Sequence, residues 1–234
     1  DIINQTVKAG GNVVIPSFAI ERTQELLYHL NGLLGEKKIP SLVAFVDSPM
    51  AIRVTEVFGR HKELFDEETC KLLDQGNHPC DFPGLVMSRT ADQSKAINHV
   101  KGTALIIAGS GMCTGGRIKF HLANNIERPE STILFIGYQA VGTLGRIILE
   151  GKDEVRIMGQ KRAVKARIAR INGFSAHAGQ SELHRWISTL QEAPRHVFVT
   201  HGEPEAAQAL AGWFKNEKGW SSSTPDYLDS VTLD

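Results

Sequence analysis

The sequence predicts an α/β protein built on a doubly wound parallel sheet. Five apolar runs of strand length, rich in β-branched residues, lack the polar alternation of half-exposed strands, which is typical of a parallel sheet covered on both faces. Segments with helical periodicity separate these runs, and regular strand–helix alternation favours the same class. With 234 residues, of which 41% are hydrophobic and 22% charged, the chain can bury a globular core without disulfides.

The elements follow one another in a regular order. The predicted strands of the sheet are Asn12–Ser17, Leu42–Asp47, Leu85–Ser88, Thr103–Gly109 and Thr132–Gly137. The predicted helices between them are Ala19–Leu34, Thr90–Val100 and Gly116–Ile126. Apolar residues of each helix recur three or four positions apart, as on the face of a helix that covers a sheet.

The pattern changes after about residue 150. Glu154–Met158 and Ala163–Ile171 predict a hairpin, because the second segment alternates apolar and basic residues. The remaining predictions are a helix at Gly179–Leu190, a buried strand at His196–Thr200, a helix at Pro204–Phe214 and a strand at Tyr227–Leu233. We place a domain boundary near residue 171, which gives domains 1–171 and 172–234.

Charge and cysteine content limit the function classes. Lys plus Arg equals Asp plus Glu at 26 each, so any polyanion must be bound by a local patch rather than by a basic surface. No stretch approaches the roughly 18 to 20 apolar residues of a membrane span, and we expect no membrane partner. Three cysteines without a CxxC pair indicate a reducing, cytoplasmic setting. Because the chain starts at Asp1 rather than Met, we expect it to be part of a longer protein.

A glycine-rich segment, Gly109–Arg117, follows a predicted strand and opens a predicted helix. Backbone amides at such a place can face an anion, and Ser110, Gly111 and Arg117 favour a contact with a phosphodiester. The spacing is also close to a dinucleotide fingerprint, but the next strand lacks the acidic residue that a ribose needs. A tight strand-to-helix turn without ligand is the remaining alternative.

Two loop histidines are candidates for chemistry. His177 lies in the small-residue turn Gly173–Gly179, and His201 follows a predicted strand directly, at the edge where ligands collect in open α/β folds. No HxHxDH, HExxH or Cys/His cluster accompanies them, so the residues do not form a closed zinc shell. Solvated or capping histidines are the alternative.

Other polar residues have ordinary interpretations as well. Asp47 and Ser48 end a strand and precede Pro49, which is typical of a helix N-cap with proline in the first turn. Arg22 and Gln24 lie on the polar side of the first predicted helix and could serve an anion or water. We interpret the tryptophans and phenylalanines as core residues rather than base-stacking platforms, and Cys113 has no partner that would make it a nucleophile.

Taken together, these segments resemble the β-CASP branch of the metallo-β-lactamase-fold ribonucleases, and within it the relatives of the endonuclease that processes pre-mRNA 3′ ends. The matching stretches are Ile15–Leu26, Asp47–Ala51, Gly109–Arg117, Gly137–Gln139, Phe174–His177 and His201–Glu203. The combination is specific, although each motif alone is weak. The resemblance covers most of the chain, from about residue 11 to residue 203.

The resemblance implies a zinc-dependent ribonuclease with two zinc ions between a lactamase core and a β-CASP cap. Residues 1–171 would be the Rossmann-like β-CASP domain, and 172–234 the returning C-terminal segment of the αββα lactamase fold. His177 would assist proton transfer at the scissile phosphate, and His201 would bind zinc. Arg22, Gln24, Ser110, Gly111, Arg117 and Ser175 would contact RNA.

The resemblance also has a gap, because the HxHxDH motif and the other zinc ligands of the family have no counterpart in this chain. We therefore expect an N-terminal lactamase core of the same protein as a partner, besides RNA, and an isolated chain without activity. Apolar surface around His196–Thr200 would favour a homodimer. The alternatives are a non-catalytic RNA- or protein-binding β-CASP scaffold and a nucleotide-binding α/β domain.

Overall fold

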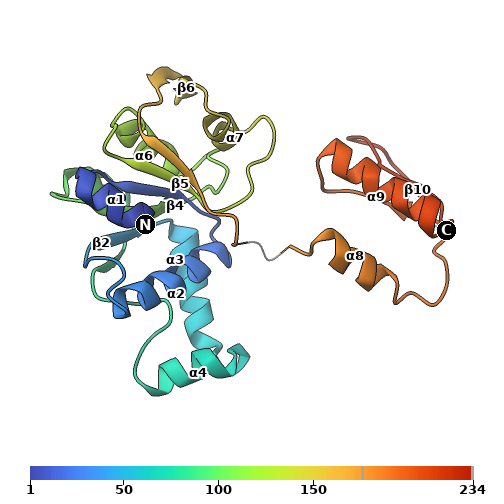
Figure 1. Ribbon diagram of the computed structural model, residues 1–234, viewed down its shortest axis with the longest axis horizontal. Coiled ribbons are helices and arrows are strands. Elements are labelled where there is room, and N and C mark those ends of the chain that lie inside the picture. The colour runs from blue at the N-terminus through green and yellow to red at the C-terminus, as the bar shows by residue number, and fades with distance from the viewer. Residues whose placement is uncertain (175–176, 233–234) are drawn as a thin grey trace. The chain divides into compact units, whose positions relative to one another are not determined.

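The computed structural model describes residues 1–174 and 177–232 and divides into two compact units, Asp1–Ser175 and Ala176–Asp234. The first unit is a six-stranded parallel sheet with helices on both faces (Figure 1). This architecture confirms the predicted fold class. In the described part of the chain, no helix is long and apolar enough to cross a bilayer. The assignment of 1–171 and 172–234 to two family domains stays a prediction.

The elements of the first unit alternate through most of its length. Its strands are β1 (Val13–Pro16), β2 (Val43–Asp47), β3 (Leu85–Met87), β4 (Ala104–Ala108), β5 (Thr132–Phe135), β6 (Glu154–Ile157), β7 (Gln160–Ala163) and β8 (Arg167–Arg170). Its helices are α1 (Ile2–Ala9), α2 (Arg22–Gly35), α3 (Pro49–Arg60), α4 (Glu67–Asp74), α5 (Ala91–Ala96), α6 (Ile118–Asn125) and α7 (Leu144–Leu149), with short 3-10 turns η1 (Lys62–Leu64) and η2 (Ile97–His99).

The sheet separates two apolar cores. Its strand order is β3-β2-β4-β1-β5-β8, and every neighbouring pair is parallel. Successive side chains alternate between the faces: Val13 and Ile15 pack with α1, α2 and α3, whereas Val14 packs with α6, α7 and η2. Figure 1 shows α2 and α3 on one side of the sheet and α6 and α7 on the other. All five strands predicted for this sheet are present.

The connections reverse direction at the centre of the sheet. The chain leaves β1 into α2 on one face, and it leaves the adjacent β4 into α6 on the opposite face. The two loops therefore diverge at the carboxyl ends of neighbouring strands, which is where open α/β sheets form their ligand crevices.

One predicted pairing is wrong. The hairpin partner of β6 is β7, with Glu154 opposite Ala163, and not the segment Ala163–Ile171. That segment contains β8, which joins the edge of the main sheet parallel to β5. Its alternation of apolar and basic residues arises because an edge strand of a parallel sheet keeps exposed positions, as a hairpin strand does.

The second unit is small, and its described residues form two helices and two short strands. It contains α8 (Gln180–Ile187), β9 (Val197–Phe198), α9 (Pro204–Glu217) and β10 (Ser222–Ser223). The strand predicted at His196–Thr200 shortens to β9 and is only half-buried. The strand predicted at Tyr227–Leu233 is wrong over its described residues, because residues 227–232 form a turn and irregular chain. The strand β9 pairs with β10. Trp186 is 70% exposed, so its interpretation as a core residue is also wrong.

Close backbone packing gives a test of this fold. A Cβ on Gly11 would lie 1.9 Å from the carbonyl oxygen of Glu130, so the link between α1 and β1 can pass the segment before β5 only with a glycine at this position. We expect Gly11→Ala to lower the free energy of unfolding by roughly 1–3 kcal/mol, as overpacking does.

Gly32→Ala is the matched control, because nothing lies within 4 Å of its Cβ position in α2. It should stabilise the helix by up to about 1 kcal/mol. Urea unfolding measures both, and equal effects of the two changes would contradict the packing.

Candidate functional site

A hollow of about 380 Å³ opens at the carboxyl ends of β1, β2 and β4. It is lined by the segments 17–19, 47–50, 109–111 and 116–117, which follow these three strands. Ser110, Gly111 and Arg117, which the sequence predicts to contact RNA, all line this hollow. The structure thus brings these three candidates together at the point where the connections diverge.

The wall of the hollow is held by a fully buried carboxylate. Asp47, at the end of β2, accepts hydrogen bonds at Oδ2 from Ser94 at 2.5 Å, and the same oxygen lies 2.6 Å from Nε2 of His121. Its Oδ1 accepts from Nη1 of Arg117 at 2.7 Å. Burial alone would raise the pKa of the Asp47 carboxyl, but hydrogen bonds from His121, Ser94 and Arg117 outweigh it and lower the pKa below its ordinary value. Asp47 is therefore a stable anion in the folded chain.

Arg117 is largely committed to this structure. Besides Asp47, its guanidinium donates to the carbonyl oxygens of Ser88 at 2.9 Å and Arg89 at 3.1 Å. These three hydrogen bonds use Nη1 and Nη2, and no hydrogen bond of Nε is present among the described residues. The guanidinium of Arg117 has five N–H donors, so its Nε edge can still donate to an anion in the hollow.

The glycine-rich loop closes on itself. The hydroxyl oxygen of Ser110 accepts from the amides of Thr114 at 3.0 Å and Gly115 at 3.2 Å. The first amides of α6 donate within the chain as well, beginning with Ile118 to the carbonyl of Gly109 at 3.0 Å. An anion would therefore meet the Ser110 and Arg117 side chains rather than the amides of this helix. Burial raises the pKa of the Cys113 thiol to about 12, which agrees with its exclusion as a nucleophile.

Arg22 and Gln24 are buried at the start of α2. Nη1 of Arg22 pairs with Glu25 at 2.5 Å. Nε2 of Gln24 donates to Thr55 at 2.8 Å and to the carbonyl of Ala19 at 3.2 Å, so this side chain joins α2 to α3. Neither residue lines the hollow, and their contact with RNA stays a prediction.

The other candidates belong to the C-terminal part of the chain. Ser175 lies outside the described residues. His177 and His201 are exposed, and His201 adopts a φ of 61° between β9 and α9. Nowhere in 1–174 or 177–232 do three His, Cys, Asp or Glu side chains form a group that could hold a metal ion. A zinc pair therefore does not fit these residues by themselves, and the roles of His177 and His201 stay predictions.

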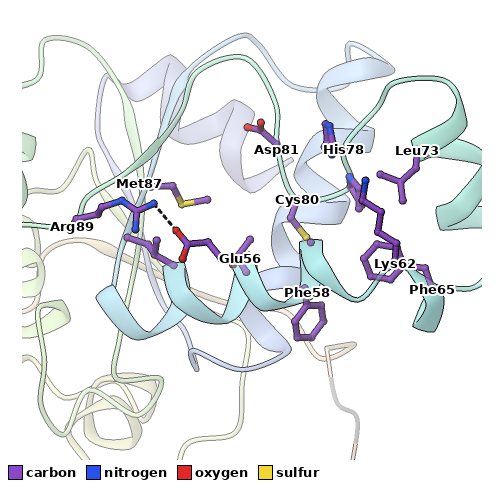
Figure 2. Close-up of a pocket in the computed structure, with 14 residues that line it drawn as sticks. Glu56, Phe58, Lys62, Phe65, Leu73, His78, Cys80, Asp81, Met87 and Arg89 are labelled. Atoms are coloured by element: carbon purple, nitrogen blue, oxygen red, sulfur yellow. Dashed lines mark hydrogen bonds and ion pairs between the residues drawn. The ribbon is translucent and has the colours of Figure 1, made fainter.

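A second hollow of about 330 Å³ lies along α3, next to η1 and α4. Figure 2 shows the ion pair of Arg89 and Glu56 at one end and Lys62, His78 and Phe65 at the other, with Cys80 between them. Burial, followed by the charge of Asp81, raises the pKa of the Cys80 thiol to about 11, so the thiol is unreactive. Arg89 lies between the two hollows. Its carbonyl oxygen accepts a hydrogen bond from Arg117, which lines the first hollow, and its side chain pairs with Glu56, which lines the second.

Two features of the first hollow, at the ends of β1, β2 and β4, were not predicted from the sequence. Ser48 caps α3 as predicted, by accepting from the amide of Ala51 at 3.3 Å, but Asp47 has a different role as the buried partner of His121 and Arg117. A signal was present, since Arg117 and His121 are four positions apart and so share one face of α6. The second feature is Phe18, which lines the hollow and is 38% exposed, so its interpretation as a core residue is wrong.

The Asp47 cluster makes a prediction about stability and pH. Asp47→Asn leaves Arg117 without its carboxylate and should lower the free energy of unfolding by about 3–5 kcal/mol at neutral pH. Because folding lowers the pKa of Asp47, its contribution is complete above the ordinary value of 3.8 and is lost as the pH falls through the lower folded-state pKa. Urea unfolding at descending pH should show the gap between wild type and variant shrinking. The exposed Asp92→Asn should stay within about 0.5 kcal/mol of wild type throughout. A gap that is constant with pH would contradict this account.

Comparison with known proteins gives two family matches. The model of the β-CASP domain matches residues 23–148, and that of the "Zn-dependent metallo-hydrolase RNA specificity domain" matches residues 161–225. The second match begins within β7 and so spans both compact units.

Several named relatives align with most of this chain. Ribonuclease TTHA0252 of Thermus thermophilus is 40% identical over 90% of this chain and 47% of its own length. The transcription termination factor FttA of Methanosarcina mazei is 31% identical over 90% of this chain and 34% of its own. An RNase J-like protein of Methanocaldococcus jannaschii is 30% identical over 86% of this chain and 45% of its own. The chain thus spans about half or less of the length of these relatives. It belongs to the β-CASP ribonuclease family, which confirms the resemblance seen in its motifs.

Proposed function

We propose that this chain holds single RNA strands as the cap of a ribonuclease that hydrolyses phosphodiester bonds. The observation that carries the proposal is the hollow at the carboxyl ends of β1, β2 and β4, where the family's glycine-rich loop meets Arg117. The names of two relatives, a ribonuclease and an RNase J-like protein, support RNA as the substrate class. All three cysteines are free, which suits a cytoplasmic enzyme.

Within this proposal the residues of the hollow bind and orient RNA rather than cleave it. Asp47 fixes the Arg117 guanidinium, whose unused edge faces a phosphate, and the Ser110 hydroxyl adds a second donor. His177, whose side chain is exposed, would move a proton at the leaving or attacking oxygen, a role that suits an imidazole. The RNA end preference, whether internal or 5′-terminal, would depend on parts of the protein beyond this hollow.

The metal requirement is a separate part of the proposal. A two-metal hydrolase needs several ligands around each ion, and the described residues offer no such group. We therefore assign His201 a single ligand position, with the other ligands supplied by an N-terminal lactamase core of the same protein. Dimerisation through the half-buried β9 region would be a further property of the whole protein.

The two histidines are distinguishable by metal content. In the whole native protein, His177→Ala should slow cleavage of a labelled single-stranded RNA by roughly 10² to 10⁴-fold and leave the zinc content unchanged. His201→Ala should lower the zinc content, as mass spectrometry of the dialysed protein measures. The exposed His99→Ala is the control and should change neither. Loss of zinc in His177→Ala would overturn its role, and a wild-type protein that binds but never cuts RNA would establish the scaffold alternative.

The phosphate contact of Arg117 is testable through salt. Each phosphate neutralised on a single strand adds about 0.7 to the slope of log binding constant against log salt concentration. The paired change Asp47→Asn with Arg117→Gln removes both charges, so that no buried carboxylate is left alone. We expect this variant to lose about 0.7 from the slope, whereas Arg128→Gln, whose residue pairs with Glu130 outside the hollow, should keep it. A slope that the paired change leaves intact would mean that Arg117 serves only Asp47 and that the loop is a tight turn.

A further inference from the structure

The Phe18 ring occupies space that is open only because glycines, without side chains, lie next to it. Phe18 follows β1 directly, and a Cβ on Gly111 would lie 2.6 Å from its Cδ2, while one on Gly137 would lie 3.2 Å from its Cε2. The ring therefore rests against the backbone of the loops that follow β4 and β5. The carbonyl of Phe18 accepts from the Thr23 hydroxyl at 2.7 Å, which fixes the chain at this position. Phe18 is thus held in place on both its backbone and its ring.

This fixed ring is nevertheless open to the hollow. Phe18 is 38% exposed and lines the same hollow as Ser110 and Arg117. Apolar surface continues from it, because Met50 is 64% exposed and lines both this hollow and a shallow neighbour that Ile20 shares. Leaving apolar area in water is unfavourable. An arrangement that keeps an aromatic ring beside polar donors suits a ligand with both a flat apolar part and an anionic part.

We propose that Phe18 stacks against a nucleobase of a single-stranded RNA whose phosphate lies beside Ser110 and Arg117. The inference rests on the proposed function and adds a requirement to it. Every base offers a flat π face, so stacking on an aromatic ring is tolerant of sequence. A base in a duplex has both faces covered by its neighbours, so the platform selects strands whose bases are unstacked. Met50 and Ile20 extend the apolar surface on which the same base or the next one lies.

The experiment compares two strands with the same phosphates. A short single-stranded RNA carrying one 2-aminopurine, and an abasic strand of equal length, are titrated with the full chain in the presence of EDTA. Phe18→Leu should weaken binding of the RNA by about 5- to 150-fold, which corresponds to the loss of one stacked base. It should also remove the quenching of 2-aminopurine that the wild type produces. Both proteins should bind the abasic strand equally.

Matched variants separate the ring from its surroundings. Phe18→Tyr keeps a ring in the same position, and its affinity for the RNA should stay within about twofold of that of wild type. Phe120→Leu changes another exposed phenylalanine, on α6 and outside the hollow, and should bind as wild type does. A matched RNA duplex should bind the wild type more weakly than the single strand does.

Each outcome has one meaning. Equal RNA binding and equal quenching by wild type and Phe18→Leu would overturn the stacking platform and leave the proposed function standing. A wild type that binds neither strand would overturn the proposed function itself. If Phe18→Leu fails to fold, a photo-crosslink from 4-thiouridine RNA to wild type decides, because fragmentation of the tryptic peptide of residues 9–22 distinguishes a crosslink on Phe18 from one on Arg22. Crosslinks confined to other residues would refute the inference.

Discussion

The buried carboxylate of Asp47 is the interaction on which the arrangement of the hollow depends. It joins the end of β2 to Ser94 on α5, to Arg117 at the N-cap of α6 and to His121 within α6. An unpaired anion at this depth would be very costly, so the partners must be in place whenever the chain is folded. The same bonds fix the direction of Arg117, and with it the polar edge of the hollow.

Glycine packing determines the other side of the hollow. Gly116 has a φ of 73°, and a Cβ there would lie 2.4 Å from the carbonyl of Gly109, so the loop can fold back on itself only without side chains. Gly111 and Gly137 leave room for the Phe18 ring in the same way. The glycines of these loops thus have a packing role, and the contact of Gly111 with RNA stays a prediction. They bring backbone close to backbone and place a rigid aromatic ring where a ligand can reach it.

Much of this fold could be predicted from the sequence, because the length and β-branched content of apolar runs such as 104–108 and 132–135 favour strands covered on both faces. The strand predictions failed where the pattern of apolar and polar residues fits more than one kind of strand, or none. The edge strand β8 has the alternation of a hairpin strand, and the two serines of β10 carry no apolar signal at all. In the site, Gln24 has the polarity of a surface residue but satisfies carbonyl groups between α2 and α3. The pairing of Asp47 with His121 spans 74 positions, and only the folded sheet brings the two together.

Charge pairing around the hollow has a consequence for how RNA would be held. Arg117 is compensated by Asp47, and the chain as a whole carries no net charge. Long-range attraction and counterion release, which supply most non-specific affinity for nucleic acids, are therefore weak here. A site of this kind must obtain its affinity from short-range contacts, and base stacking is a contact that does not depend on net charge. An exposed ring beside an arginine that is paired with a carboxylate is thus a physically consistent way for a chain of zero net charge to bind a polyanion. The ring selects unpaired strands, and the arginine sets the position of the phosphate.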